Sequence, residues 1–289
     1  MHFNEFRTNV ESLAKLDVDN LNDIQKLISE YYGKIGTLEF DCKNMFVVRA
    51  SRNGNREIFS NIQRCSYNPK VSDIPIQRCN YPGQQVFYCS MYTETHKAFT
   101  SITCIMETAM EQIKNYKINE CCYTLSRWDL KRPLKLWALP FSKLSHLQND
   151  DFKFMSDELK KALKTHPAKK EIVIAYKYMS EVFCKRINKK LYYKISSAFF
   201  NFLLTLEQKC DGIAYPSANT ERAGINVALN KILVDDKILV GTAATLYFLK
   251  RNQSDKKKLS ILPCSKNAFP DSMGKLHFYI DVTAQNDFM

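Results

Sequence analysis

The sequence predicts an α+β fold, and three observations lead to this class. Short apolar runs without helical periodicity, typical of strands, occur in both halves of the chain, for example at residues 43–51 and 237–250. Apolar residues spaced three and four apart predict helices near the N-terminus and through the middle of the chain. No internal repeat is visible. We therefore expect one domain over residues 1–289, with an N-terminal helical extension at 1–40 and a helical insertion or lid at 150–209.

The N-terminal part begins with helical periodicity at residues 8–32. The strand expected at 43–51 carries Arg49 near its end. The segment that follows, 53–83, contains several glycines and prolines, so we expect a loop with one short helix at 56–62.

The next two elements carry polar residues of interest. A strand expected at 84–90 places Tyr88 and Ser90 on the same side, because side chains alternate along a strand. A helix is expected at 97–114, with Glu107 at the margin of an apolar stripe that should face the core. That stripe is formed by Phe99, Ile102, Met106, Ala109 and Ile113.

The rest of the chain reads as strands on either side of three helices. The expected strands are 121–128, 134–141, 212–217, 237–250, 258–264 and 275–282. The expected helices are 151–165, 169–188 and 193–209.

Composition narrows the class of protein. A hydrophobic content of 45% is ordinary for a globular protein and argues against disorder. The apolar run at 195–206 is too short to cross a bilayer, and the N-terminus does not resemble a signal peptide. We therefore expect a cytoplasmic protein with no membrane partner. The 10 cysteines are scattered without a CxxC pair, and the 5 histidines do not fall at ligand spacing, so we expect reduced thiols and no metal.

Positive charge is concentrated in one part of the chain. The formal net charge is +12, and residues 160–194 hold eleven Lys or Arg against Glu171 and Glu181, which gives a net charge of +9 in that segment. Such a segment can be a solvated helix face, a surface for an acidic partner protein, or a nucleic-acid surface. Nucleic acid is the least favoured of the three, because no recognition motif accompanies the charge.

Several polar residues stand at expected strand ends or within apolar contexts. Arg49 closes the apolar run "MFVVR", Tyr88 lies in "VFYCS" and Glu107 lies in "CIMETAM". Arg78 precedes the turn "YPG", and Ser217 ends "GIAYPS". Each of these residues also has a plain structural explanation, as a surface cation, a solvated helix residue or a turn residue.

Taken together and in order, these segments resemble the RES domain family. The resemblance covers about residues 44–250, and its most specific part is "DGIAYPSANTERAGINVAL". The arginine, glutamate and serine that give this family its name are matched by Arg49, Glu107 and Ser217. The resemblance implies an ADP-ribosyltransferase-like mixed β-sheet core with helices. It also implies a toxin that degrades NAD, as an NAD phosphorylase or NAD glycohydrolase, and that is neutralised by a cognate antitoxin.

The residues within the resemblance divide into expected catalytic and expected NAD-binding residues. Arg49, Glu107 and Ser217 are the expected catalytic residues. Glu107 would stabilise the positive charge that develops as the nicotinamide leaves. The expected NAD-binding residues are Tyr88, Arg78, Ser90, Asn219 and Arg222. Arg49, and as a second choice Arg78, would hold the pyrophosphate or an attacking inorganic phosphate, because guanidinium groups bind phosphate oxygens at two points.

Some alternatives stay open. Glu94 is a rival to Glu107, which we prefer because "META" places its carboxylate among apolar residues. The acceptor of ADP-ribose could be phosphate, water, a protein or a nucleic acid. A binding module for nucleic acid without enzymatic activity is a further alternative. The sequence leaves the oligomeric state undecided.

Overall fold

The computed structural model has the mixed α+β architecture that the sequence predicts. It describes residues 1–16, 19–35, 39–42, 46–54, 57–93, 97–114, 120–141, 148–185, 189–206, 210–252, 254–255 and 258–280. The chain divides into two compact units. Unit 1 comprises Met1–Lys43, Asn68–Tyr88 and Pro133–Lys231, and unit 2 comprises Asn44–Tyr67, Cys89–Arg132 and Ile232–Met289.

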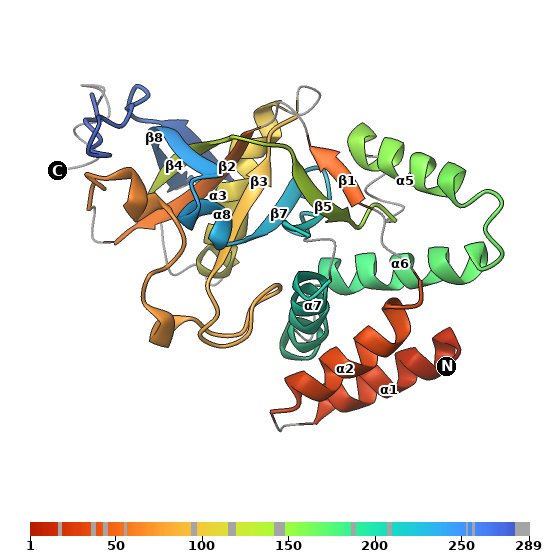
Figure 1. Ribbon diagram of the computed structural model, residues 1–289. Helices are drawn as coiled ribbons and strands as arrows, with labels where there is room; N and C mark the ends of the chain where they lie inside the picture. The colour runs from red at the N-terminus through yellow and green to blue at the C-terminus, as the bar shows by residue number, and fades with distance from the viewer. Residues whose placement is uncertain are drawn as a thin grey trace. The chain divides into compact units, whose positions relative to one another are not determined.

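Unit 1 combines helices with a mixed sheet (Figure 1). Its helices are α1 (Phe3–Lys15), α2 (Leu21–Tyr32), α5 (Asp150–Ala162), α6 (Lys169–Cys184), α7 (Lys189–Leu204) and the short 3-10 helix η3 (Val71–Asp73). Its strands are β1 (Glu39–Cys42), β5 (Leu134–Ala138), β6 (Gly212–Pro216) and β7 (Ile225–Asn230). In the order β1-β5-β6-β7, the β5–β6 pair is parallel and the two outer pairs are antiparallel.

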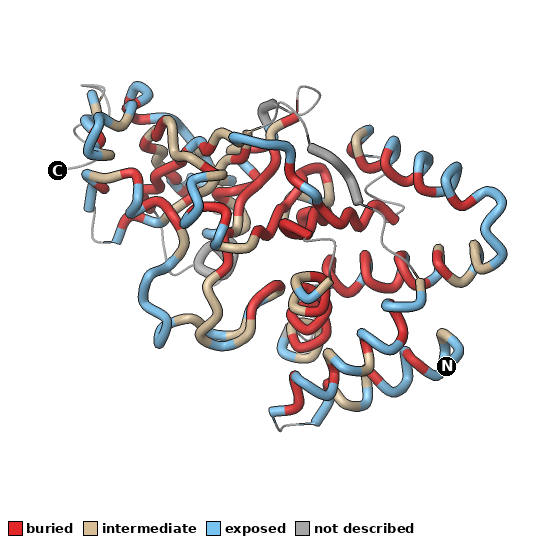
Figure 2. The backbone as a smooth tube through the Cα atoms, in the orientation of Figure 1, coloured by how far each residue is buried: buried red, intermediate tan, exposed pale blue. Residues whose placement is uncertain are grey.

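The core of unit 1 is aromatic and lies between helices and strands. The Trp137 ring of β5 stacks on Tyr176 of α6 at 5.3 Å and meets Phe199 of α7 edge-on at 5.6 Å. Phe6 of α1 stacks on Tyr31 of α2 at 4.3 Å within the same core. The inner sides of α6 and α7 are accordingly buried, as Figure 2 shows in red. The N-terminal helices and the basic helices thus share one core.

The basic segment is not uniformly a solvated face. Lys194 is buried, and its ammonium group donates to the Leu16 carbonyl at 2.7 Å and to the Asn20 side chain at 3.3 Å. Leu16 is the residue that ends α1, so this lysine satisfies a carbonyl at a helix C-terminus. By contrast, Lys160 and Lys161 are exposed and pair with acidic residues on their own helix. The segment therefore contributes both to the fold and to the surface.

Unit 2 is built on antiparallel strands. They are the last part of β3 (Val86–Met91), β2 (Phe46–Asn53), β4 (Glu120–Leu130), β8 (Leu239–Arg251) and β9 (Leu259–Pro263), in the order β3-β2-β4-β8-β9. Its helices are α3 (Lys97–Lys114), α8 (Ile232–Asp235) and the 3-10 helix η2 (Ile62–Cys65).

Helix α3 covers one face of this sheet. Ala50 and Leu125 are paired neighbours on β2 and β4, and both pack with Ile105 of α3 in one buried cluster. The adjacent residues of each strand point to the other face. There, Ile62 of η2 lies beside Trp128, close to Gly241. The two faces are therefore covered by different segments, α3 and η2.

The structure confirms several sequence predictions and corrects others. Helix α3 has the predicted bounds. Of the predicted inner stripe, Ala109 is buried against the sheet, but Phe99 and Ile102 are 42% and 39% exposed, so the stripe is wrong in its first half. Residues 57–61 form no helix, and the 3-10 helix η2 begins only at Ile62, so the short helix expected at 56–62 is not found at the predicted position. Residues 275–280 form no strand, only isolated bridges. Strands β1 and β7 were not expected.

A turn near the end of the described part of unit 2 is held by Asp271. Its carboxylate accepts backbone N–H groups from Met273 at 2.8 Å and Lys275 at 2.9 Å, and Gly274 has the positive φ of 77° that the turn requires. The carbonyls of Gly274 and Met273 in turn accept from Ile62 and Asn61. These bonds fix the turn to the η2 segment.

This turn should be sensitive to acid. Hydrogen bonds from Lys275 and Met273 lower the pKa of Asp271 from its ordinary 3.8. Because the pKa in the folded state is the lower one, the stabilisation is complete above the unfolded value and is lost as pH falls through the folded value. We expect the amide chemical shifts of Met273 and Lys275 to titrate together, with a midpoint below 3.8, and Asp271→Asn to abolish the titration. A midpoint above that value would contradict the assignment.

Candidate functional site

Ser217 lies at the end of β6, at the start of a closed turn that leads into β7. Its N–H donates to the Gly224 carbonyl at 2.9 Å, and its carbonyl accepts from Arg222 at 2.8 Å. Its hydroxyl oxygen accepts the Thr220 N–H at 3.3 Å. Glu221 and Arg222 have positive φ angles of 51° and 73°, a conformation uncommon for residues other than glycine. The turn is thus tightly specified around a fully buried serine.

A second residue anchors this turn, and the sequence reasoning missed it. Asn149 is 1% exposed and immediately precedes α5. Its side-chain oxygen accepts the N–H groups of Asp151 and Phe152, which caps the helix, while its side-chain nitrogen donates to the Ala223 carbonyl at 2.6 Å. One amide group therefore connects the first turn of α5 to the Ser217 turn. An asparagine before "DDF" is a capping signal, but its second bond depends on the tertiary fold.

Replacing Asn149 by alanine should lower the free energy of unfolding by about 2 kcal/mol, because a helix cap is lost and a buried carbonyl loses its donor. The measurement is chemical denaturation of the full chain. Asn68→Ala is the matched control, since exposed Asn68 makes a local turn bond to the Lys70 N–H and its loss should cost well under 1 kcal/mol. Equal effects of the two substitutions would contradict the anchoring role of Asn149.

Arg78 lies among aromatic rings in unit 1. Its guanidinium carbon is 5.2 Å from the ring centre of Tyr193 on α7 and 6.0 Å from that of Tyr215 on β6. Both distances are within the range of cation–π contacts. Tyr215 precedes Ser217 by two residues. The loop containing Arg78 is therefore adjacent to the strand that presents Ser217, although the two segments are far apart in the sequence.

The residues that follow Arg78 fix the position of Tyr88. The Tyr88 hydroxyl accepts the Cys79 N–H at 2.8 Å and donates to the Asn80 side chain at 2.9 Å. Burial raises the pKa of Tyr88 well above its ordinary value and also raises the pKa of the Cys79 thiol. Both groups are therefore neutral at physiological pH. They can donate or accept hydrogen bonds, but Cys79 is not a thiolate nucleophile.

Arg49 is on β2 in unit 2, and its guanidinium Nε donates to the Ser66 carbonyl at 3.0 Å. Arg49 is paired with Ser126 of β4 in the sheet. The indole N–H of buried Trp128 donates to the Ser126 hydroxyl at 2.8 Å. This is the sheet face that η2 covers. Arg49 therefore lies on the face opposite to α3.

Glu107 is half-buried on α3. It lies one helical turn after Thr103 and Cys104, on the same side of α3. This side faces the sheet, because the Cys104 thiol donates to the Val48 carbonyl of β2 at 2.8 Å. Buried Ser90 of β3 is paired with Val48, so it belongs to this same face. Glu107 and Ser90 thus lie on the same face of the sheet of unit 2, and Arg49 lies on the opposite face. Glu94, the rival carboxylate, lies outside the described residues.

The predicted site residues are divided between the two units. Unit 1 contains Arg78, Tyr88, Ser217, Asn219 and Arg222, and unit 2 contains Arg49, Ser90 and Glu107. Asn219 and Arg222 are half-buried in the Ser217 turn. Within unit 1, contacts connect the Arg78 loop with the strand that ends before Ser217. That Arg49, Glu107 and Ser217 converge in one cleft stays a prediction.

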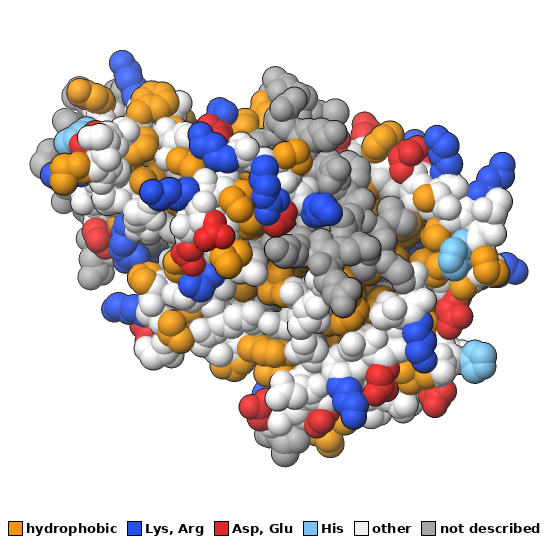
Figure 3. All heavy atoms as spheres, viewed as in Figure 1, with side chains coloured by type: hydrophobic (Ala, Val, Ile, Leu, Met, Phe, Trp, Pro, Cys, Tyr) orange, Lys and Arg blue, Asp and Glu red, His pale blue; other side chains and the backbone are white. Residues whose placement is uncertain are grey.

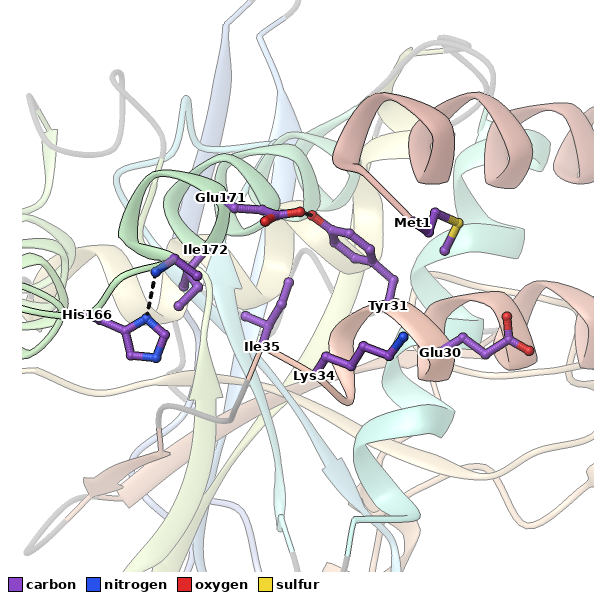
Figure 4. A pocket seen from close by; sticks show the side chains of 9 residues that line it. Met1, Glu30, Tyr31, Lys34, Ile35, His166, Glu171 and Ile172 are labelled. Atoms are coloured by element: carbon purple, nitrogen blue, oxygen red, sulfur yellow. Dashed lines mark hydrogen bonds between the residues drawn. The ribbon is translucent and has the colours of Figure 1, made fainter.

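A small hollow occurs elsewhere in unit 1 (Figure 4). It encloses about 180 Å³ and is lined by Glu30, Tyr31, Lys34, His166 and Glu171, among others. The Tyr31 hydroxyl donates to the Glu171 carboxylate at 3.4 Å. None of the predicted site residues lines this hollow. It is therefore separate from the Ser217 turn.

Over the described residues no cluster of three or more His, Cys, Asp or Glu is arranged to hold a metal ion. None of the described helices has both the length and the apolar character needed to span a membrane. No family model and no curated protein matches the chain.

Proposed function

We propose that the protein cleaves NAD between nicotinamide and ribose, with water or inorganic phosphate as the acceptor, on an ADP-ribosyltransferase-like core of the RES type. The C1′–N bond breaks, and its electron pair stays with the nicotinamide, which leaves as a neutral molecule. A bond forms between C1′ and an oxygen of water or phosphate, and the acceptor releases its proton. In the cell this activity would arrest growth, and a cognate antitoxin would hold the enzyme in check.

The observation that carries this proposal is the contact between Arg78 and Tyr215, two residues before Ser217. It joins two motifs of the resemblance, "RCNYPG" and "GIAYPS", which are distant in the sequence. A guanidinium held by aromatic rings is positioned to bind a pyrophosphate in a bidentate manner. The rigid turn from Ser217 to Gly224 supplies fixed polar groups beside it, as a binding site for a polar ligand requires.

The remaining roles follow from the chemistry. Glu107, as a carboxylate, would stabilise the oxocarbenium-like centre at C1′. Ser217 would hydrogen-bond to the nicotinamide ribose or its carboxamide, and Tyr88 would offer its ring to the ribose or nicotinamide. Arg49 is the weaker choice for the pyrophosphate, since its guanidinium is bonded to Ser66 on the face away from α3. Arg78 is our preferred phosphate-binding residue.

The test is to incubate the purified full-length chain with NAD, with and without inorganic phosphate, and to follow nicotinamide and the ADP-ribose products. Free ADP-ribose or its phosphate supports the proposal. Label from NAD retained on a protein or nucleic acid would instead indicate ADP-ribosyl transfer. Absence of nicotinamide release from freshly prepared protein would reject both activities, and salt-sensitive nucleic-acid binding in the same preparation would then indicate a binding module.

A further inference from the structure

The most exposed large apolar side chains of the described residues are concentrated near the end of unit 2. Tyr279, Met273 and Phe269 are 75%, 72% and 70% exposed, and Leu262 is 61% exposed. Figure 1 draws this segment in dark blue at the left of the view, and Figure 2 shows much of it as exposed. Scattered apolar side chains are normal on a protein surface, but several with this exposure within one short segment indicate an interaction site.

These side chains are held outward by an ordered frame. The Asp271 turn is tied to the η2 segment by the bonds described above, and the backbone of Ala268 exchanges two 2.8 Å hydrogen bonds with Ala244 of β8. The Lys266 N–H donates to the Tyr279 carbonyl at 3.1 Å. Phe278 packs inward on the cluster around Leu246, whereas the adjacent Tyr279 is exposed. The exposed residues are thus fixed in position before any partner binds, which lowers the entropic cost of binding.

The charge of this surface is positive. Between Lys266 and Tyr279 the sequence has two lysines, at 266 and 275, and one acidic residue, Asp271, while Lys258 pairs with the Asp255 carboxylate at 3.7 Å. The Asp271 carboxylate is occupied by two backbone N–H groups of its own turn. Lys266 and Lys275 are exposed, and Figure 3 shows basic and hydrophobic side chains beside one another at this end of unit 2. An apolar surface edged by lysines complements a surface that is itself apolar and anionic.

We infer that this surface binds the headgroup region of an anionic lipid bilayer. Protruding apolar side chains enter the boundary between headgroups and acyl chains, while nearby lysines bind anionic headgroups. The composition favours lipid over single-stranded nucleic acid, because Leu262 and Met273 have no ring on which a base could stack. A protein strand added to β9 is less favoured, since that strand is short and ends at Pro263, which has no N–H to donate. The inference requires no spanning helix and is independent of the proposed NAD chemistry.

The experiment is co-sedimentation of the full-length chain with vesicles of phosphatidylcholine alone or mixed with phosphatidylserine. We expect binding to the anionic vesicles only, and weakening as salt rises. The double substitution Phe269→Ser with Met273→Ser should weaken binding about tenfold or more, because two inserted side chains are lost. Lys266→Glu with Lys275→Glu should weaken it by about tenfold as well.

Matched controls are available in unit 1. Phe154→Ser removes an apolar side chain that is 60% exposed, and Lys161→Glu reverses an exposed lysine on the same helix, α5. Both should bind vesicles as the unsubstituted chain does, and thermal unfolding should confirm that all variants are folded. Absence of binding to anionic vesicles, or equal losses in the control variants, would overturn the inference. So would a dimer of the free chain that the Phe269 and Met273 substitutions convert to a monomer, because a second copy would then be the partner.

Discussion

Replacing Glu107 by glutamine should lower the rate of nicotinamide release from NAD by about a hundredfold, which corresponds to about 2.7 kcal/mol of transition-state stabilisation. Glutamine has nearly the same size and shape as glutamate but carries no charge. The loss should therefore appear in kcat, because the positive charge at C1′ develops only as the bond to nicotinamide breaks. KM should change little.

The half-buried position of Glu107 makes this substitution interpretable, since an isosteric change there should leave the thermal midpoint close to that of the unsubstituted chain. Glu181→Gln on α6 is the matched control, because Glu181 is an exposed carboxylate to which the proposal gives no role, and the kcat of this variant should not change. An unchanged kcat in Glu107→Gln together with a large loss in Glu94→Gln would transfer the catalytic role to Glu94. Equal losses of kcat in Glu107→Gln and Glu181→Gln would indicate a general effect of the protein's charge rather than a catalytic role of Glu107.

The sequence predicted α3 accurately in extent but not in orientation. Its helical periodicity is clear, so its bounds could be recognised. Which side faces the sheet depends on contacts that the pattern does not contain. Thr100 and Cys104 are acceptable inside because their side chains donate to the strand carbonyls of Met91 and Val48. Polar residues that are satisfied in this way occupy the inner side, and the more apolar stripe is left partly exposed.

The sequence could predict single segments of the candidate site, but not the contacts between these segments. The strand that presents Ser217 was expected at 212–217, and the structure places a closed turn after it. Strand β7, which follows this turn, was not expected from the sequence. The contact of Arg78 with Tyr193 and Tyr215 joins three distant segments, and no local pattern reports a contact of that kind. Likewise, strand alternation predicts that Arg49 and Val48 point to opposite faces of the sheet, but only the tertiary fold determines which of these faces α3 covers.

The second large effect concerns the strand pair that presents Ser217. Gly212 begins β6 and is paired with Leu229 of β7. A Cβ atom at this position would lie 2.2 Å from the backbone oxygen of Ala228, and 3.0 Å from the Leu229 Cα. Both are backbone atoms, so no side-chain rotation relieves the overlap, and the two strands must separate. Gly212→Ala should therefore lower the free energy of unfolding by about 3 kcal/mol, at the upper end of the cost of overpacking.

This substitution also tests whether the Ser217 turn depends on the β6–β7 pair. If the strands separate at Gly212, the bond between the Ser217 N–H and the Gly224 carbonyl should loosen, and exchange of that amide with solvent should accelerate. Gly54→Ala is the matched control, because a Cβ atom there meets no atom within 4 Å, and its free energy of unfolding should change by less than about 0.5 kcal/mol. Denaturation and amide exchange of both variants provide the comparison. Unchanged exchange at Ser217 in a destabilised Gly212→Ala chain would show that the turn is held by its own bonds and by Asn149, independently of the strand pair.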